Sequence, residues 1–148
     1  MNSIDLAQTM QTLSVLALPA IFAITLHEAA HGFVAYQLGD DSAWRMGRVT
    51  FNPLRHIDPV GTILIPLVLL LSNTGFLFGY AKPVPVSFSR LRHPRIDMIW
   101  VALAGPGTNV LLAIASALLL YLLPFVPAIA SGWLHATLVT SIKFNVLL

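Results

Sequence analysis

The stretch Leu26-His27-Glu28-Ala29-Ala30-His31-Gly32 places three ionisable side chains inside a long apolar run. Residues 13–38 are otherwise apolar, small or weakly polar, which predicts one helix long enough to cross a bilayer. Residues four apart share a helix face, so the imidazoles of His27 and His31 can point at one metal ion. Glu28 lies about 100° round the helix from His27, close enough to act on a water at that metal. Ionisable groups are costly in a membrane span and therefore indicate function.

The composition indicates an integral membrane protein. The 148 residues leave room for a single domain, residues 1–148; 57% of them are hydrophobic and only 9% charged. A soluble domain carries about 25% charged residues, so this chain cannot cover a surface facing water. The absence of cysteine excludes disulfides, thiolate zinc sites and a cysteine nucleophile. No nucleic-acid site is expected, because seven basic residues fall between apolar segments, where they orient membrane proteins: Arg45, Arg48, Arg55, Lys82, Arg90, Arg92 and Arg95.

The apolar segments predict about three transmembrane helices, over residues 13–38, 96–123 and 132–148. A fourth segment, residues 60–80, has only about 12 apolar or small residues before a polar break, which is short for a span. If it crosses the bilayer, the basic residues lie on both sides. If it is a re-entrant hairpin, all seven lie on the cytoplasmic face, and charge bias favours this second topology.

Residues 42–52 alternate between apolar and polar side chains, and the phase of the alternation changes near Gly47. This pattern predicts a short amphipathic strand or hairpin at the membrane surface, with a bulge at Gly47; an ordinary polar loop is the alternative. The predicted fold class is therefore an all-α polytopic membrane protein with a re-entrant or short fourth segment and a small membrane-surface β-hairpin.

The residue types of the first motif are those of a zinc hydrolase. Such a site takes three protein ligands and keeps a fourth position for water. Neutral imidazoles at His27 and His31 supply two ligands, and Glu28, the only glutamate in the chain, can move the water proton. His31 lies about five to eight residues from the predicted helix end, roughly 10 Å, so water can reach it.

Four motifs together resemble the site-2 protease family of intramembrane zinc metalloproteases, and more narrowly its small bacterial members without a PDZ domain. They are LHEAAHG (26–32), GRVTFNPLRHIDPVGT (47–62), GYAKPVPV (79–86) and ALAGPGTN (102–109). The resemblance covers nearly the whole chain. It implies one Zn²⁺ ion held by His27 and His31, with Glu28 as the catalytic acid and base.

The same resemblance brings two further segments to the site. The AGPxxN segment, with Gly105, Pro106 and Asn109, is expected on the helix beside the metal, where helix packing is as good an explanation as catalysis. Phe144-Asn145 matches the start of the family's third motif. Asn145 is then expected to steady the developing oxyanion, while a simple interhelical hydrogen bond is the alternative.

The third zinc ligand of the family is an Asp in a Leu-Asp-Gly segment that this sequence does not contain. Either the chain is truncated before that motif or another residue substitutes. The candidates to substitute are Asp58, Asp97, His56, His93 and His135. Each has a simpler role as a cap, turn or surface residue.

The sequence therefore predicts a zinc-dependent endopeptidase that cuts peptide bonds in or near transmembrane segments of other proteins. Arg48, Val49 and Thr50 are the expected strand edge for an extended substrate, and residues 81–86 can line the same cleft. The expected location is a bacterial inner membrane, multi-pass, with the site near the cytoplasmic face. An inactive homologue or fragment that binds membrane partners, and a metal-handling membrane protein, stay open as alternatives.

Overall fold

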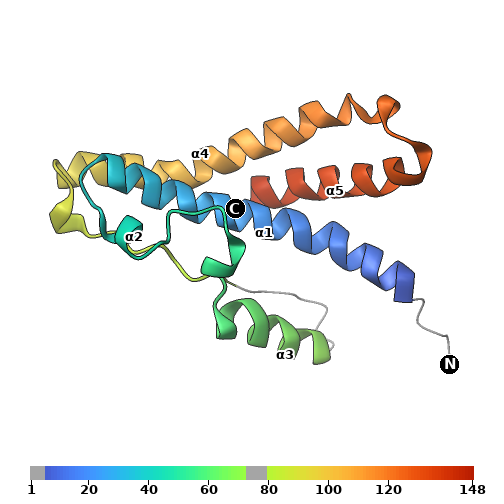
Figure 1. The fold of residues 1–148 in the computed structure, drawn as a ribbon, viewed down its shortest axis with the longest axis horizontal. Coiled ribbons are helices and arrows are strands. Elements are labelled where there is room, and N and C mark those ends of the chain that lie inside the picture. Colours follow the sequence, from blue (N-terminus) through green and yellow to red (C-terminus); the bar gives the residue numbers. More distant parts are fainter. Residues whose placement is uncertain (1–5, 73–79) are drawn as a thin grey trace. The chain divides into compact units, whose positions relative to one another are not determined.

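The computed structural model describes residues 6–72 and 80–148, with the side chains of residues 66 and 70 left out, and its regular structure is helical (Figure 1). The long helices are α1 (Leu6–Gln37), α4 (Pro94–Leu120) and α5 (Ala128–Leu147). Shorter elements lie between them: α2 (Ser42–Arg45), η1 (Pro53–Arg55), η2 (Pro59–Leu64), α3 (Ile65–Leu71), η3 (Phe88–Arg90) and η4 (Leu123–Phe125).

The chain divides into two compact units, and α1 and α4 each contribute to both. The first unit joins residues 1–27 to residues 106–148. Within it, α5 contacts the other two long helices through polar side chains: Trp133 Nε1 donates to Ser14 Oγ at 2.9 Å, and the hydroxyls of Ser116 and Ser141 lie 2.8 Å apart. Hydrogen bonds of this kind hold helices together where apolar contacts give no net gain over lipid.

The second unit, residues 28–105, has a small apolar core made by Ala35, Leu91 and Val101. The predicted end of the first helix is confirmed: α1 stops at Gln37, and Gly39 follows with a φ of 111°. This left-handed conformation suits glycine and lets the chain turn back on the helix end.

The predicted β-hairpin at residues 42–52 is wrong, because the described residues contain no strand and this segment begins with the short helix α2. Gly47 has a φ of 63°, and the N–H groups of Gly47 and Arg48 donate to Trp44 O and Ala43 O, both at 2.9 Å. The phase change in the sequence therefore marks a left-handed glycine after one helical turn, not a bulge between paired strands.

The two ends of the segment from residue 60 to residue 80 are hydrogen-bonded to each other. Tyr80 N–H donates to Gly61 O at 3.0 Å, and Thr62 Oγ1 donates to Tyr80 O at 2.8 Å. A single crossing of a bilayer would separate these ends by about 30 Å, so the hydrogen bonds support the re-entrant topology. The first part of this segment forms η2, a π-helical turn, and then α3. The turn of the predicted re-entrant hairpin, at the polar break near residues 72–75, falls largely outside the described residues.

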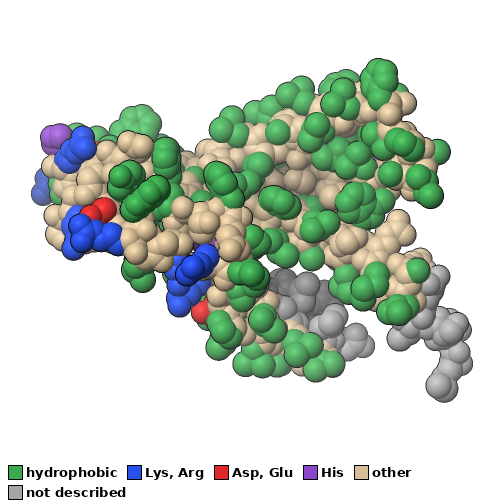
Figure 2. All heavy atoms as spheres, viewed as in Figure 1, with side chains coloured by type: hydrophobic (Ala, Val, Ile, Leu, Met, Phe, Trp, Pro, Cys, Tyr) green, Lys and Arg blue, Asp and Glu red, His purple; other side chains and the backbone are tan. Residues whose placement is uncertain are grey.

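Apolar side chains dominate the surface (Figure 2). Phe22 on α1, Leu111 on α4 and Ile129 on α5 are each more than 60% exposed. Several polar residues are buried, although they are among the most easily hydrated: Thr25, Asp40, His56, Asp97, Asn109, Ser116 and Asn145. Water-soluble proteins show the reverse distribution, so this surface suits an apolar surrounding.

Two helices, α1 and α4, are long and apolar enough to cross a membrane, and only 17% of the apolar stretch of each is buried. That low value distinguishes them from core helices of a soluble protein. The expected count of about three spans is not supported, because among the described residues α5 does not join this group. Its His135, Lys143 and Asn145 lower its mean hydropathy.

A buried carboxylate ties the loop after α1 to the segment before α4. Asp40 is fully buried, and its two oxygens accept hydrogen bonds from Ser42 N–H and Ser87 N–H. Burial raises the pKa of Asp40, but these hydrogen bonds and the nearby Arg90 outweigh it, and the net pKa lies below its ordinary value. The neighbouring Asp41 forms exposed ion pairs with Arg45 and Arg90.

Gly61→Ala is expected to open the re-entrant segment. A Cβ at this position would lie 2.4 Å from the Tyr80 ring. Tyr80 is also the residue whose N–H donates to Gly61 O, so the added methyl group would push against that hydrogen bond. Overpacking of this kind costs about 1–3 kcal/mol. The measurement is the thermal midpoint in detergent. Gly132→Ala is the matched control, because no atom lies within 4 Å of its added Cβ; equal midpoints for the two variants would contradict the contact.

Asp40→Asn is expected to destabilise the protein by about 1–3 kcal/mol at neutral pH, since the Ser87 N–H loses a buried, charged acceptor. Because folding lowers the pKa of Asp40, its contribution is complete above the ordinary value of about 3.9 and is lost as the pH falls through the folded-state value. The stability gap between wild type and variant should thus close in acid. Asp41→Asn, at an exposed ion pair, should show almost no gap at any pH.

Candidate metal centre

The first motif lies on α1 as expected, within one unbroken helix. His27, Glu28 and His31 are all partly buried. The four-residue spacing puts the two imidazoles on one face, one turn apart. Two histidines placed in this way can supply two nitrogen ligands to one metal ion, provided that the correct nitrogen of each ring carries the lone pair.

The tautomer of His31 is fixed by a backbone carbonyl in its own unit. His31 Nδ1 lies 2.6 Å from Val101 O. A carbonyl oxygen can only accept, so Nδ1 carries the proton and donates it to Val101. The neutral ring then has its lone pair on Nε2, the form that a metal ligand requires.

His27 meets an amide instead. The side-chain nitrogen of Asn109 lies 2.9 Å from His27 Nδ1, within the first unit. Asn109 is almost completely buried, and its Oδ1 has no hydrogen-bond partner among the described residues. With the amide rotated by half a turn, Oδ1 would accept a proton from Nδ1, and the lone pair of His27 would move to Nε2. Asn109 can therefore set the tautomer of His27, which goes beyond the packing role expected for its segment.

Glu28 is held by a backbone N–H in the second unit. Val84 N–H donates to Glu28 Oε2 at 2.8 Å. Gly32, one turn further along α1, lets the Val84 segment come close enough to make this bond. A Cβ there would lie 2.9 Å from the side chains of both Val49 and Val84. Sequence reasoning missed Val84 and Val101, because each acts through a backbone group, which leaves no side-chain signal.

The remaining site predictions divide by unit. Gly105 belongs to the second unit and is buried. Pro106 and Gly107 belong to the first unit, and Pro106 is exposed. An added Cβ at Gly107 would meet no atom within 4 Å, so close helix packing does not explain that glycine. Asn145 is also in the first unit and buried; its Nδ2 donates to Ser141 O at 2.9 Å, while its Oδ1 has no partner among the described residues.

Arg48, Val49 and Thr50 do not form a strand edge. Arg48 N–H already donates to Ala43 O, and Thr50 O already accepts from His56 Nε2 at 3.1 Å. Val49 directs its side chain towards Gly32. The backbone groups that would pair with an extended peptide are in part used within the loop, so the structure gives no support to strand addition there.

The candidates for a third ligand are engaged elsewhere or exposed. Asp58 accepts from the N–H groups at the start of η2, and Asp97 accepts from His93 N–H at the start of α4, so both act as helix caps. His56 is buried and donates through Nε2 to a carbonyl, whereas the side chains of His93 and His135 are exposed. No set of three or more His, Asp or Glu able to hold a metal comes together in residues 6–72 and 80–148.

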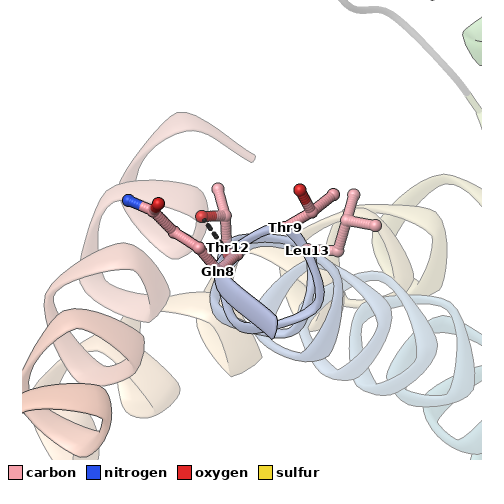
Figure 3. A pocket seen from close by; sticks show the side chains of 4 residues that line it. All are labelled: Gln8, Thr9, Thr12 and Leu13. Carbon is pink, nitrogen blue, oxygen red and sulfur yellow. Dashed lines mark hydrogen bonds between the residues drawn. The ribbon is translucent and has the colours of Figure 1, made fainter. Parts of the chain in front are cut away.

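A shallow hollow near the start of α1 offers no competing site. It is lined by Gln8, Thr9, Thr12 and Leu13, and Thr12 Oγ1 donates to Gln8 O at 2.9 Å (Figure 3). None of its side chains is ionisable, and it lies about four helical turns before His27. The candidate chemistry therefore stays with the motif residues.

Comparison with curated proteins matches this motif-bearing chain to metalloproteases. It is 43% identical over 108 residues to "Putative zinc metalloprotease YwhC" of Bacillus subtilis, an alignment that covers 73% of the chain and 46% of that protein. It is 33% identical over 95 residues to "Putative zinc metalloprotease Rip2" of Mycolicibacterium smegmatis, covering 64% of the chain and 35% of that protein.

The chain is a homologue of these metalloproteases. Their names agree with the zinc metalloprotease character that the motif resemblance implies. The chain spans less than half the length of these relatives. No family model and no solved structure matches it.

The contact between Asn109 and His27 gives a direct prediction for metal binding. Asn109→Leu removes the group that can fix the His27 ring, so the affinity of the protein for zinc should fall about 10- to 100-fold. Asn109→Asp keeps an acceptor and should bind zinc nearly as wild type does. Calorimetric or competition titration with zinc measures both.

Ser116→Ala is the control for this prediction, because it removes a different buried polar group from the same helix and the same unit. It should leave zinc affinity unchanged. Wild-type zinc affinity in Asn109→Leu would show that Asn109 only packs.

Proposed function

We propose that this chain carries the catalytic helix of a zinc-dependent membrane endopeptidase of the site-2 type. The observation that carries the proposal is the hydrogen bond from His31 Nδ1 to Val101 O, in a helix that also places His27 one turn earlier. A metal-ligating histidine typically donates its other ring nitrogen to such a carbonyl. The homologous proteins named as zinc metalloproteases support the choice of metal.

Nε2 of His27 and Nε2 of His31 would hold the zinc ion. Both are uncharged nitrogen donors, which zinc accepts readily, and both lie on one helix face. A hydrolytic site needs a third protein ligand, and the described residues do not bring one to the pair. The family resemblance assigns that ligand to the Asp of a Leu-Asp-Gly segment, which this sequence does not contain.

Glu28 would be the general base and acid of the reaction. Zinc, when bound, polarises the scissile carbonyl and makes a water more acidic. Glu28 takes the proton from this water and transfers it to the amine that leaves. One carboxylate oxygen already accepts Val84 N–H, so the other is the oxygen that exchanges the proton.

Asn145 would stabilise the negative oxygen that develops during the attack. Its amide nitrogen has two hydrogens and donates to Ser141 O at 2.9 Å and to Ser141 Oγ at 3.3 Å. An oxyanion would replace the longer of these two bonds. Burial strengthens such a bond, because few waters compete for the donor.

The substrate would be a transmembrane segment of another protein, and the reaction would take place within a bilayer close to the cytoplasmic face. His31 lies six residues before the end of α1, so about 9 Å of helix separates it from the loop. All seven basic residues between the apolar segments belong to the second unit, and the blue side chains visible in Figure 2 lie in separate groups on the left of the view. In a bacterial inner membrane, basic loops of this kind favour the cytoplasm.

The test uses the full-length protein in detergent or nanodiscs, with a transmembrane model substrate. Glu28→Gln should keep bound zinc and lose cleavage by a factor of about 10²–10⁴, the typical contribution of general acid–base catalysis. His31→Ala should lose the zinc as well. His135→Ala, on an exposed site of α5, is the control and should keep both properties.

Three outcomes would contradict the proposal. Zinc binding without any cleavage by the wild type would indicate an inactive homologue that binds membrane partners. Zinc flux into proteoliposomes without cleavage would indicate a metal-handling protein. Unchanged zinc content in both His27→Ala and His31→Ala would remove the metal site from α1.

A further inference from the structure

The segment that reaches Glu28 has an unusual supply of hydrogen-bond donors. Pro83, Val84 and Pro85 follow one another, and proline has no N–H. Val84 is therefore the only residue of the three that can donate, and its N–H is directed to Glu28 Oε2 at 2.8 Å. The proline after it also restricts Val84 to an extended conformation, which holds the direction of this N–H.

Bonds on both sides fix the position of this extended segment, residues 81–87, which we name the strap. Before Val84, Lys82 N–H donates to His56 O at 2.9 Å. After it, Ser87 N–H donates to the buried carboxylate of Asp40. All of these residues belong to the second unit. The contact with Glu28 is thus the middle one of three anchor points.

The side chain of Val84 adds a fourth constraint. It is 92% removed from solvent and packs where α1 has Gly32 in place of a larger residue. The strap therefore lies directly on the turn of α1 that follows His31. Little displacement of Val84 is possible without breaking bonds at Lys82 or Ser87.

We propose that the strap is a positioning element for the catalytic carboxylate, acting through the backbone N–H of Val84. By occupying Oε2, the N–H fixes the rotation of the Glu28 carboxylate and directs Oε1 to the water that loses its proton. The role deepens the proposed function and depends on it. Val84 itself touches neither substrate nor metal in this role.

The deciding variant is Val84→Pro. It removes the N–H and keeps an extended backbone between two prolines, and the anchors at Lys82 and Ser87 remain. Turnover of a transmembrane model substrate by the full-length protein should fall about 10- to 100-fold, as expected for the loss of a hydrogen bond to a charged group. Zinc content should not change. Val84→Ala, which keeps the N–H and shortens the side chain, should lose less than about threefold.

A second measurement does not depend on activity or on zinc. Amide hydrogen exchange at Val84 should be slow in the wild type and in Glu28→Gln, whose side-chain oxygen still accepts. It should become fast in Glu28→Ala. Exchange at Ser87, bonded to Asp40, should stay slow in all three and serves as the internal control.

The outcomes separate the strap from the wider proposal. If the wild type cleaves and Val84→Pro, folded, cleaves at the same rate, the strap has no positioning role while the protease assignment stands. If Val84 exchanges rapidly in the wild type, the contact with Glu28 is absent and the inference is wrong. If exchange at Val84 is slow but the wild type does not cleave, or Glu28→Gln cleaves at the wild-type rate, the protease assignment fails instead.

Discussion

A histidine in an apolar helix can hold a metal only when its ring is fixed from the side away from that metal. In this chain the carbonyl of Val101 does this for His31, at 2.6 Å. The bond decides which nitrogen is protonated, and it can form only because α4 supplies a backbone acceptor beside α1. The same constraint applies to His27, for which Asn109 is the partner. The motif needs a second helix before it becomes a site.

Backbone groups provide much of the hydrogen bonding to the motif residues. Val101 offers an acceptor, Val84 offers a donor, and Gly32 offers the space that lets the neighbouring loops approach. This economy suits a protein with few polar side chains. In lipid, each buried polar atom needs a partner, and a backbone group supplies one without adding another polar side chain.

The residues allowed some features to be predicted and left others open. The end of α1 just before Gly39 and the return of the chain at Tyr80 follow local rules for glycine and for charge bias. The hairpin over residues 42–52 was predicted wrongly, because period-two alternation over a few residues cannot be told from one helical turn closed by a left-handed glycine. The contacts at Val84 and Val101 could not be predicted, because backbone groups make them and the side-chain identity carries no signal for them.

The names of the homologues point to zinc chemistry, and the structure shows the hydrogen-bond partners of the two imidazoles, Val101 O for His31 and Asn109 for His27. Extended X-ray absorption fine structure at the zinc edge of the full-length protein tests most directly whether these imidazoles bind zinc. The account predicts two imidazole nitrogens at about 2.0–2.1 Å from the metal in the wild type, and no bound zinc in His31→Ala. A zinc shell without imidazole scattering, or one that His31→Ala leaves unchanged, would contradict it.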